Sequence, residues 1–110
     1  MSTPELNVAL DLEAPDRVAD GMGGWTTGWR RLGRLWCAMD ARSGREKTTR
    51  LGMVSVVQWR ITTHAAPAGD PRRPEPGQRL RNGTRVFVIE AVAEAGGRHL
   101  DCFAREEDQA

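Results

Sequence analysis

The sequence lacks several features on which common protein classes depend. It has no tyrosine, only two histidines, His64 and His99, and only two cysteines, Cys37 and Cys102. Their spacing fits no metal or redox motif, so we expect no metal site and two reduced core thiols rather than a disulfide. No apolar run approaches the ~20 residues that cross a membrane as a helix. The acidic, alternating N-terminus also lacks the basic start and apolar block of a secretory signal.

Motifs that support catalysis are also missing. Ser43 and Ser55 lack the sharp elbow sequence that exposes a nucleophilic serine. The glycine-rich stretch at residues 21–24 is not followed by the lysine and hydroxyl residues of a phosphate-binding loop. We therefore expect neither an enzyme nor a bound cofactor.

The composition is that of a small globular protein. The chain has 110 residues, of which 39% are hydrophobic and 28% are charged, unlike a disordered chain. A chain of this length folds as one domain around one modest core. We therefore expect a single domain spanning residues 1–110.

Positive charge comes almost entirely from arginine and is concentrated in the middle of the chain. Fifteen arginines stand against a single lysine. Residues 1–24 have a net charge of −4, residues 25–60 of +6 and residues 61–110 of −1. A basic middle predicts an acidic partner, either nucleic acid or protein, although a solvated charged surface gives the same pattern.

Alternation of apolar and polar residues predicts a β-rich fold. Apolar residues occupy every even position from 6 to 14, which is typical of a half-buried strand, and Pro15 is expected to end it. Asn82 and Gly83 form a strong hairpin signal, since a two-residue turn accepts positive φ at both positions, and a second turn is expected at residues 95–97. The predicted strands are residues 6–14, 32–40, 53–63, 84–92 and 98–105, with a short strand at 79–81.

These strands define the expected fold class. Five to six short strands separated by turn signals indicate an all-β protein, either a small antiparallel β-barrel or a sandwich. The polar stretch 41–50 lacks alternation, and the capping-box spacing of Ser43 and Glu46 predicts one short helix there. Residues 64–78 contain four prolines and are expected to form a loop.

Four tryptophans dominate the aromatic residues. Trp36 and Trp59 fall within strand patterns and are predicted to be core residues. Trp25 and Trp29 follow the glycine-rich stretch and are predicted to be exposed, where large aromatic side chains anchor protein contacts. Stacking on the bases of single-stranded nucleic acid is the alternative role.

The order of these features along the chain resembles one protein family. A Gly-Gly-Trp stretch is followed by Trp-x-Ala, then by Ser-Gly-Arg-Glu, and later by an aromatic-x-Ile-x-x-Val pattern at Phe87, Ile89 and Val92. Over about residues 6–105 the chain thus resembles the phage head–tail joining family. Its members, also called head-closure or stopper proteins, occur in long-tailed bacterial viruses and in phage-like gene transfer particles. The acidic first strand, in place of a basic start, and the proline-rich loop at 65–77 depart from the family's pattern.

The resemblance implies a structural virion protein of a phage or phage-like particle assembled in the bacterial cytoplasm. Such a protein forms a homo-oligomeric ring, with six subunits as the family expectation. The ring lies between a portal-side adaptor and the tail terminator or tail tube protein. It closes the DNA-filled head and offers the docking face for the tail. The excursion between the second and third strands, about residues 42–56, would be a long loop that faces the channel.

The resemblance also assigns roles to two sets of residues. In the channel-facing loop, four basic residues would contact the phosphates of double-stranded DNA without reading its sequence, or would pair with acidic residues of neighbouring subunits. These residues are Arg42, Arg45, Lys47 and Arg50. Trp25 and Trp29 are expected to contact other subunits of the ring or the adaptor. Two other functions stay open: another connector role, such as tail terminator, and a small β-barrel that binds single-stranded nucleic acid.

Overall fold

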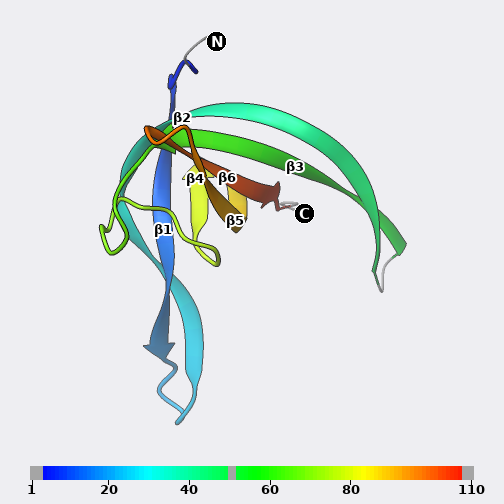
Figure 1. Cartoon of the computed structure of the whole chain (residues 1–110). Coiled ribbons are helices and arrows are strands. Elements are labelled where there is room, and N and C mark those ends of the chain that lie inside the picture. Colours follow the sequence, from blue (N-terminus) through cyan, green and yellow to red (C-terminus); the bar gives the residue numbers. More distant parts are fainter. Residues whose placement is uncertain (1–3, 50–51, 108–110) are drawn as a thin grey trace.

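The fold consists of one antiparallel sheet that closes on itself. The computed structural model describes the backbone of residues 4–49 and 52–107, and the side chains of residues 4–42 and 57–107. The six strands follow the order β1-β2-β3-β6-β5-β4 around a closed barrel (Figure 1). They are β1 (Val8–Ala19), β2 (Trp25–Thr49), β3 (Gly52–His64), β4 (Arg79–Asn82), β5 (Arg85–Ala95) and β6 (His99–Glu106). The predicted all-β fold is confirmed.

The predicted short helix is wrong. Ser43 and Glu46 lie within β2, where they pair with Gln58 and Ser55 of β3. Pairing with the β-branched strand that follows overrides the weak local helix signal. The expected loop at residues 42–56 is therefore mostly a pair of long strands.

The barrel closes where β1 meets β4. Asp11, Leu12 and Glu13 pair with Arg81, Leu80 and Arg79. Alternation along β1 points Leu10 and Leu12 inward, and both side chains are fully buried. The core cluster brings them together with apolar side chains from every other strand. These are Leu35, Cys37, Ile61, Leu80, Phe87, Ile89, Cys102 and Ala104.

The sequence predicted that the first strand ends at Pro15, but β1 does not end there. It continues to Ala19, and Pro15 pairs with Trp29 of β2. Beyond Glu13 the strand pairs with β2 alone, so one of its edges has no ladder partner among the described residues. A proline is tolerated on such an edge because no hydrogen bond of the ladder is lost there.

Two hairpin arms project from the barrel in different directions (Figure 1). The β1–β2 arm, residues 15–29, lies beyond the contact with β4, and β2 begins at Trp25, earlier than predicted. The β2–β3 arm, residues 41–49 and 52–57, lies beyond the points where β1 and β6 pair with these strands. Both arms are therefore two-stranded ribbons that continue strands of the barrel.

The cysteines and two of the tryptophans test the predicted core. Cys37 and Cys102 are free and fully buried, as predicted. Trp59 packs edge-on against Phe87, with ring centroids 6.0 Å apart, at the margin of the core. Trp36, in contrast, is 53% exposed, so its predicted core position is wrong. The register of β2 places its neighbours on the chain inside the barrel and Trp36 outside.

The hairpin between β4 and β5 forms where it was predicted, but one residue later. Asn82 pairs with Arg85, so the two turn residues are Gly83 and Thr84. Gly83 has a φ of 61°, and no non-glycine residue among those described has a positive φ. Positive φ at the first turn position alone is the pattern of a type II′ turn, for which glycine at that position is required.

Candidate assembly surfaces

The β1–β2 arm exposes large hydrophobic side chains near its tip. Met22 is 84% exposed, Trp25 61%, Val18 49% and Trp29 37%. The turn itself is ordered by Asp20, whose Oδ1 accepts hydrogen bonds from two backbone N–H groups, at 2.8 and 3.0 Å. These bonds hold the pKa of the Asp20 carboxyl below its usual value. The exposed hydrophobic side chains thus sit on a defined hairpin.

Trp25 and Trp29 lie on one face of this arm, and an arginine orders each ring. Alternation along β2 puts both residues on the same side of the ribbon. The guanidinium carbon of Arg17 lies 5.2 Å from the Trp25 ring centroid, and that of Arg79 lies 4.1 Å from the Trp29 ring centroid. Such cation–π contacts favour a fixed ring orientation. The predicted exposure of both tryptophans is confirmed, and their role in contacts stays a prediction.

Arg79 is itself held by a largely buried carboxylate. Its Nε donates a hydrogen bond to Oε1 of Glu13 at 2.6 Å, and Glu13 is only 8% exposed. This pair joins β1 to β4 at the closure of the barrel and supports the base of the arm through Trp29. Glu13 was not predicted as a buried residue, because odd positions of this alternating strand lie on its polar face.

The predicted basic residues lie on or beside the other arm. Arg42 is exposed at the base of the β2–β3 arm, at a register shift between Ala41 and Ser43. Arg45 and Lys47 lie in β2 opposite Val56 and Val54, and their side chains are not among those described. Arg50 lies outside the described residues. The structure therefore places the tryptophans on one arm and the described basic positions on the other.

A second group of charged side chains lies on the outside of the barrel, across β1, β2 and β4. Nε of Arg31 is 3.2 Å and Nε of Arg34 is 3.6 Å from Oδ1 of Asp11. On the other side of Asp11, Arg81 of β4 completes an open pocket of ≈ 260 Å³ that Arg34 also lines. These residues were not predicted to form a group, because Asp11 and Arg34 meet through the register of β1 and β2, and Arg81 joins them only when β4 closes the barrel.

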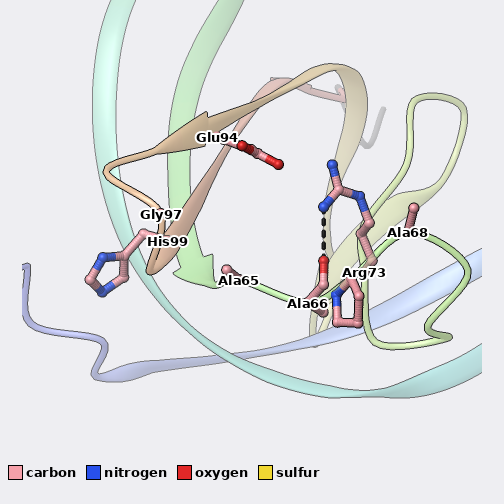
Figure 2. Close-up of a pocket in the computed structure, with 8 residues that line it drawn as sticks. Ala65, Ala66, Ala68, Arg73, Glu94, Gly97 and His99 are labelled. Carbon is pink, nitrogen blue, oxygen red and sulfur yellow. Dashed lines mark hydrogen bonds between the residues drawn. The ribbon is translucent and has the colours of Figure 1, made fainter.

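A larger pocket lies at one end of the barrel, beside the turn between β5 and β6 (Figure 2). It has a volume of ≈ 350 Å³ and is lined by alanines of the 65–68 segment together with Arg73, Glu94 and His99. Arg73 donates a hydrogen bond to the carbonyl oxygen of Ala66 at 2.8 Å. His99 stacks on His64, with ring centroids 5.9 Å apart. No nucleophile held by a base lines this pocket.

The described residues contain no group of three or more side chains that could bind a metal ion. Within the same part of the chain, no helix is long and apolar enough to cross a membrane. The distinctive surfaces are instead exposed tryptophans, an arginine-rich outer face and two projecting arms. These are features of a subunit that makes contacts with other proteins.

The comparisons with known proteins identify the family. Residues 1–107 match the model of the phage head completion protein family. A chain in a solved structure of the virion of a native gene transfer agent (GTA) particle is 44% identical and superimposes with a TM-score of 0.84. The match covers 98% of this chain and 100% of that chain. No curated protein matches the chain.

The chain belongs to the phage head completion protein family. It is a structural component of a virion or phage-like particle, not an enzyme, and it associates with other structural proteins of that particle. The resemblance stated from the sequence is confirmed.

Proposed function

We propose that the protein forms a homo-oligomeric ring, with six subunits, in the head–tail connector. The ring closes the DNA-filled head and provides the docking face for the tail. Its neighbours are the portal-side adaptor on one side and the tail terminator or tail tube protein on the other. The observation that carries this proposal is the pair of arms that leave the small barrel in different directions (Figure 1). One subunit of this shape contacts several neighbours at once.

The closed barrel suits the core of a ring subunit. Within the described residues each strand pairs with two others over part of its length, so the body presents less free strand edge for uncontrolled pairing than an open sheet does. Subunits of a ring meet through two different surfaces, because a head-to-tail contact repeated around an axis closes. Arms that differ in chemistry, one aromatic and one basic, supply such different surfaces.

In this proposal the β2–β3 arm enters the channel. Arg42, Arg45, Lys47 and Arg50 then lie near DNA phosphates, where contacts are independent of sequence and sensitive to salt. Changing all four residues to glutamine should weaken DNA retention in particles that still assemble. Unchanged retention would favour the alternative, in which these residues pair with acidic groups of neighbouring subunits.

The β1–β2 arm contacts the adjacent subunit or the adaptor through Trp25 and Trp29. Changing both to alanine should prevent incorporation into particles while leaving the monomer folded, since neither belongs to the core cluster. A far-ultraviolet circular dichroism melt of the purified variant supplies the control. A variant that no longer folds would show that the tryptophans act on stability rather than on assembly.

Electron microscopy of particles from cells that lack the gene tests the proposal as a whole. We expect free tails beside tailless heads that have lost their DNA. Heads that keep their DNA but carry no tails, or tails of abnormal length, would favour the tail terminator role. Normal tailed particles would refute both connector roles. Tight binding of single-stranded DNA by the purified monomer would then favour a nucleic-acid-binding barrel.

A further inference from the structure

Arginines gather on the outside of the barrel at the base of the β1–β2 arm, in a group that we call the arginine-rich outer face. Asp11 lies at its centre, with Arg34 of β2 and Arg81 of β4 as its register partners on either side. The full group consists of Arg31, Arg34, Arg79, Arg81, Asp11 and Glu13. Four arginines from two strands thus surround two carboxylates of β1.

Two exposed tryptophans border this face. At one margin, the guanidinium carbon of Arg79 lies 4.1 Å from the ring centroid of Trp29. At the other margin, Trp36 is 53% exposed and pairs with Ala9, which lines the pocket of ≈ 260 Å³ on this face. Tryptophan and arginine are enriched among the residues that contribute most to the affinity of protein interfaces. The composition of the face is therefore that of a binding surface.

Three arginines of the face keep unused hydrogen-bonding capacity. Arg31 and Arg34 lie near Oδ1 of Asp11, but this oxygen accepts no hydrogen bond from a described residue. Arg81 donates its Nε to a backbone carbonyl oxygen, and its Nη1 is 3.8 Å from an oxygen of Glu13. The side chains of the three arginines are about half exposed, at 55%, 60% and 48%.

Arg85 shows how a carboxylate engages an arginine more completely in this protein. Its Nε and Nη2 donate hydrogen bonds to the two carboxylate oxygens of Glu106, at 2.8 and 3.0 Å. Within the described residues, Arg31, Arg34 and Arg81 donate no such bond to a carboxylate. The pocket that Arg34 and Arg81 line is open to solvent, and it has room for a carboxylate from another molecule.

The chemistry of the face fits a protein segment better than DNA. DNA carries a phosphate at every step of its backbone, so some phosphates would lie against Asp11 at the centre of the face. A protein segment is able to place carboxylates only where the arginines lie. It also offers apolar side chains to Trp29 and Trp36, whereas the bases of a duplex are stacked inside it and give these rings no partner.

A second copy of the chain fits the face less well than a different protein does. Within the described residues, the exposed carboxylates that engage neither an arginine nor a turn lie singly on separate elements. They are Glu5 before β1, Asp16 in β1, Glu75 before β4, Glu94 in β5 and Glu107 after β6. No two of them stand at paired or alternate positions of the sheet, so no strand of a copy presents two carboxylates to Arg34 and Arg81.

We propose that the arginine-rich outer face binds an acidic segment of a different structural protein of the particle. Arg34 and Arg81 receive carboxylates of this segment at the pocket, and Trp29 and Trp36 pack against its apolar side chains. The inference rests on the proposed position in the head–tail connector, where the protein has a neighbour on either side. It states the chemistry by which one of these neighbours is recognised.

The first test measures binding of a fluorescein-labelled oligoglutamate peptide to the purified protein by fluorescence anisotropy. Arg34→Glu combined with Arg81→Glu should weaken binding by about 10-fold or more, because like charges then meet at the pocket. The matched control, Arg30→Glu with Arg98→Glu, makes the same change in net charge at two exposed arginines outside the face. It should weaken binding less than about 2-fold at physiological salt, where distant surface charges are screened. Thermal melts establish that both variants fold.

Two further measurements separate the other possible occupants. The reversal of Arg34 and Arg81 should affect binding of labelled double-stranded DNA no more than the control variant does. It should also leave the self-association of the protein unchanged in sedimentation velocity. In a gene-deletion strain, we expect the variant to be absent from purified particles, whereas the control variant is incorporated and restores tailed particles that protect DNA from nuclease.

Four results would overturn the inference. The wild type does not bind the peptide, or the reversal of Arg34 and Arg81 weakens peptide binding no more than the control does. The reversal selectively abolishes DNA binding or self-association, which would assign the face to DNA or to a second copy. The reversed variant enters particles and restores them as the wild type does. The proposed connector role is tested separately, because it fails if deletion of the gene leaves DNA retention and tail attachment unchanged.

Discussion

The pair formed by Glu13 and Arg79 should stabilise the barrel more than any surface ion pair. Its side chains are only 11% and 16% exposed, and Arg79 Nε lies 2.6 Å from Glu13 Oε1. Replacing Glu13 with alanine leaves the Arg79 guanidinium largely buried and without its partner. Breaking a buried pair in this way destabilises a protein by roughly 3–5 kcal/mol. Because this pair lies on the outer surface of the barrel, we expect the lower end, about 3 kcal/mol.

Double replacement should cost less than the single change. Glu13→Gln combined with Arg79→Met removes both charges and keeps the side-chain volume, so no unpaired charge stays buried. The remaining loss is the cation–π contact of Arg79 with Trp29, about 1 kcal/mol or less. For a domain of this size, the loss of about 3 kcal/mol expected for Glu13→Ala alone corresponds to a decrease in Tm of roughly 12 °C.

Urea unfolding followed by tryptophan fluorescence measures both effects. Arg72→Met serves as the matched control, because Arg72 forms a close pair with Asp70 but is 75% exposed, and we expect no measurable change. A Glu13→Ala variant as stable as the wild type would refute the reasoning. So would a double variant that is no more stable than Glu13→Ala, because the coupling between the two charges would then be absent.

Three further predictions follow from the perturbed pKa values. Burial raises the pKa of Cys37 to about 11 and that of Cys102 to about 12. Neither thiol should therefore react with a disulfide reagent at pH 8 until the protein is unfolded, and rapid labelling of the native protein would contradict this. The folded state lowers the Asp20 pKa, so the carboxylate stabilises its turn at neutral pH and loses this effect as the pH falls through the aspartate range. Asp20→Ala should accelerate amide exchange in that turn at pH 6 and leave exchange in the core unchanged. The hydrogen bonds from Arg85 likewise lower the pKa of Glu106, which also accepts a hydrogen bond from Nε1 of Trp59. Glu106→Gln should therefore change the fluorescence of Trp59 at neutral pH. It should also abolish the change in fluorescence that the wild type shows on acidification.

Much of the barrel was predictable because its signals are local. Alternation identified the buried face of β1, including Leu10 and Leu12, and glycine-containing turns identified both C-terminal hairpins. The ends of β1 and β2 were not predictable in this way. Whether Pro15 ends a strand depends on which of its edges has a partner, and that is decided by where β4 pairs with β1.

For the candidate surfaces too, features with local sequence signals were predictable, and features that depend on distant strand pairing were not. Exposure of Trp25 and Trp29 followed from the glycine-rich turn beside them. Trp36 was misassigned because its strand contains apolar residues at consecutive positions, and only the register shows which of them face inward. The burial of Glu13 depends on Arg79, 66 residues further along the chain, so no local pattern contains it.

Closure of the barrel also determines how its partners are able to bind. β2 pairs with β3 only from Cys37 onward, so among the described residues the segment 25–36 has one strand edge without a partner. Free edges invite strand addition by other chains, and proteins commonly protect them with charged side chains and irregular pairing. This segment has both, a register shift opposite Leu12 and Glu13 and a set of exposed arginines. These are Arg30, Arg31 and Arg34. Contacts in this region should therefore form through side chains and not through an open-ended extension of the sheet.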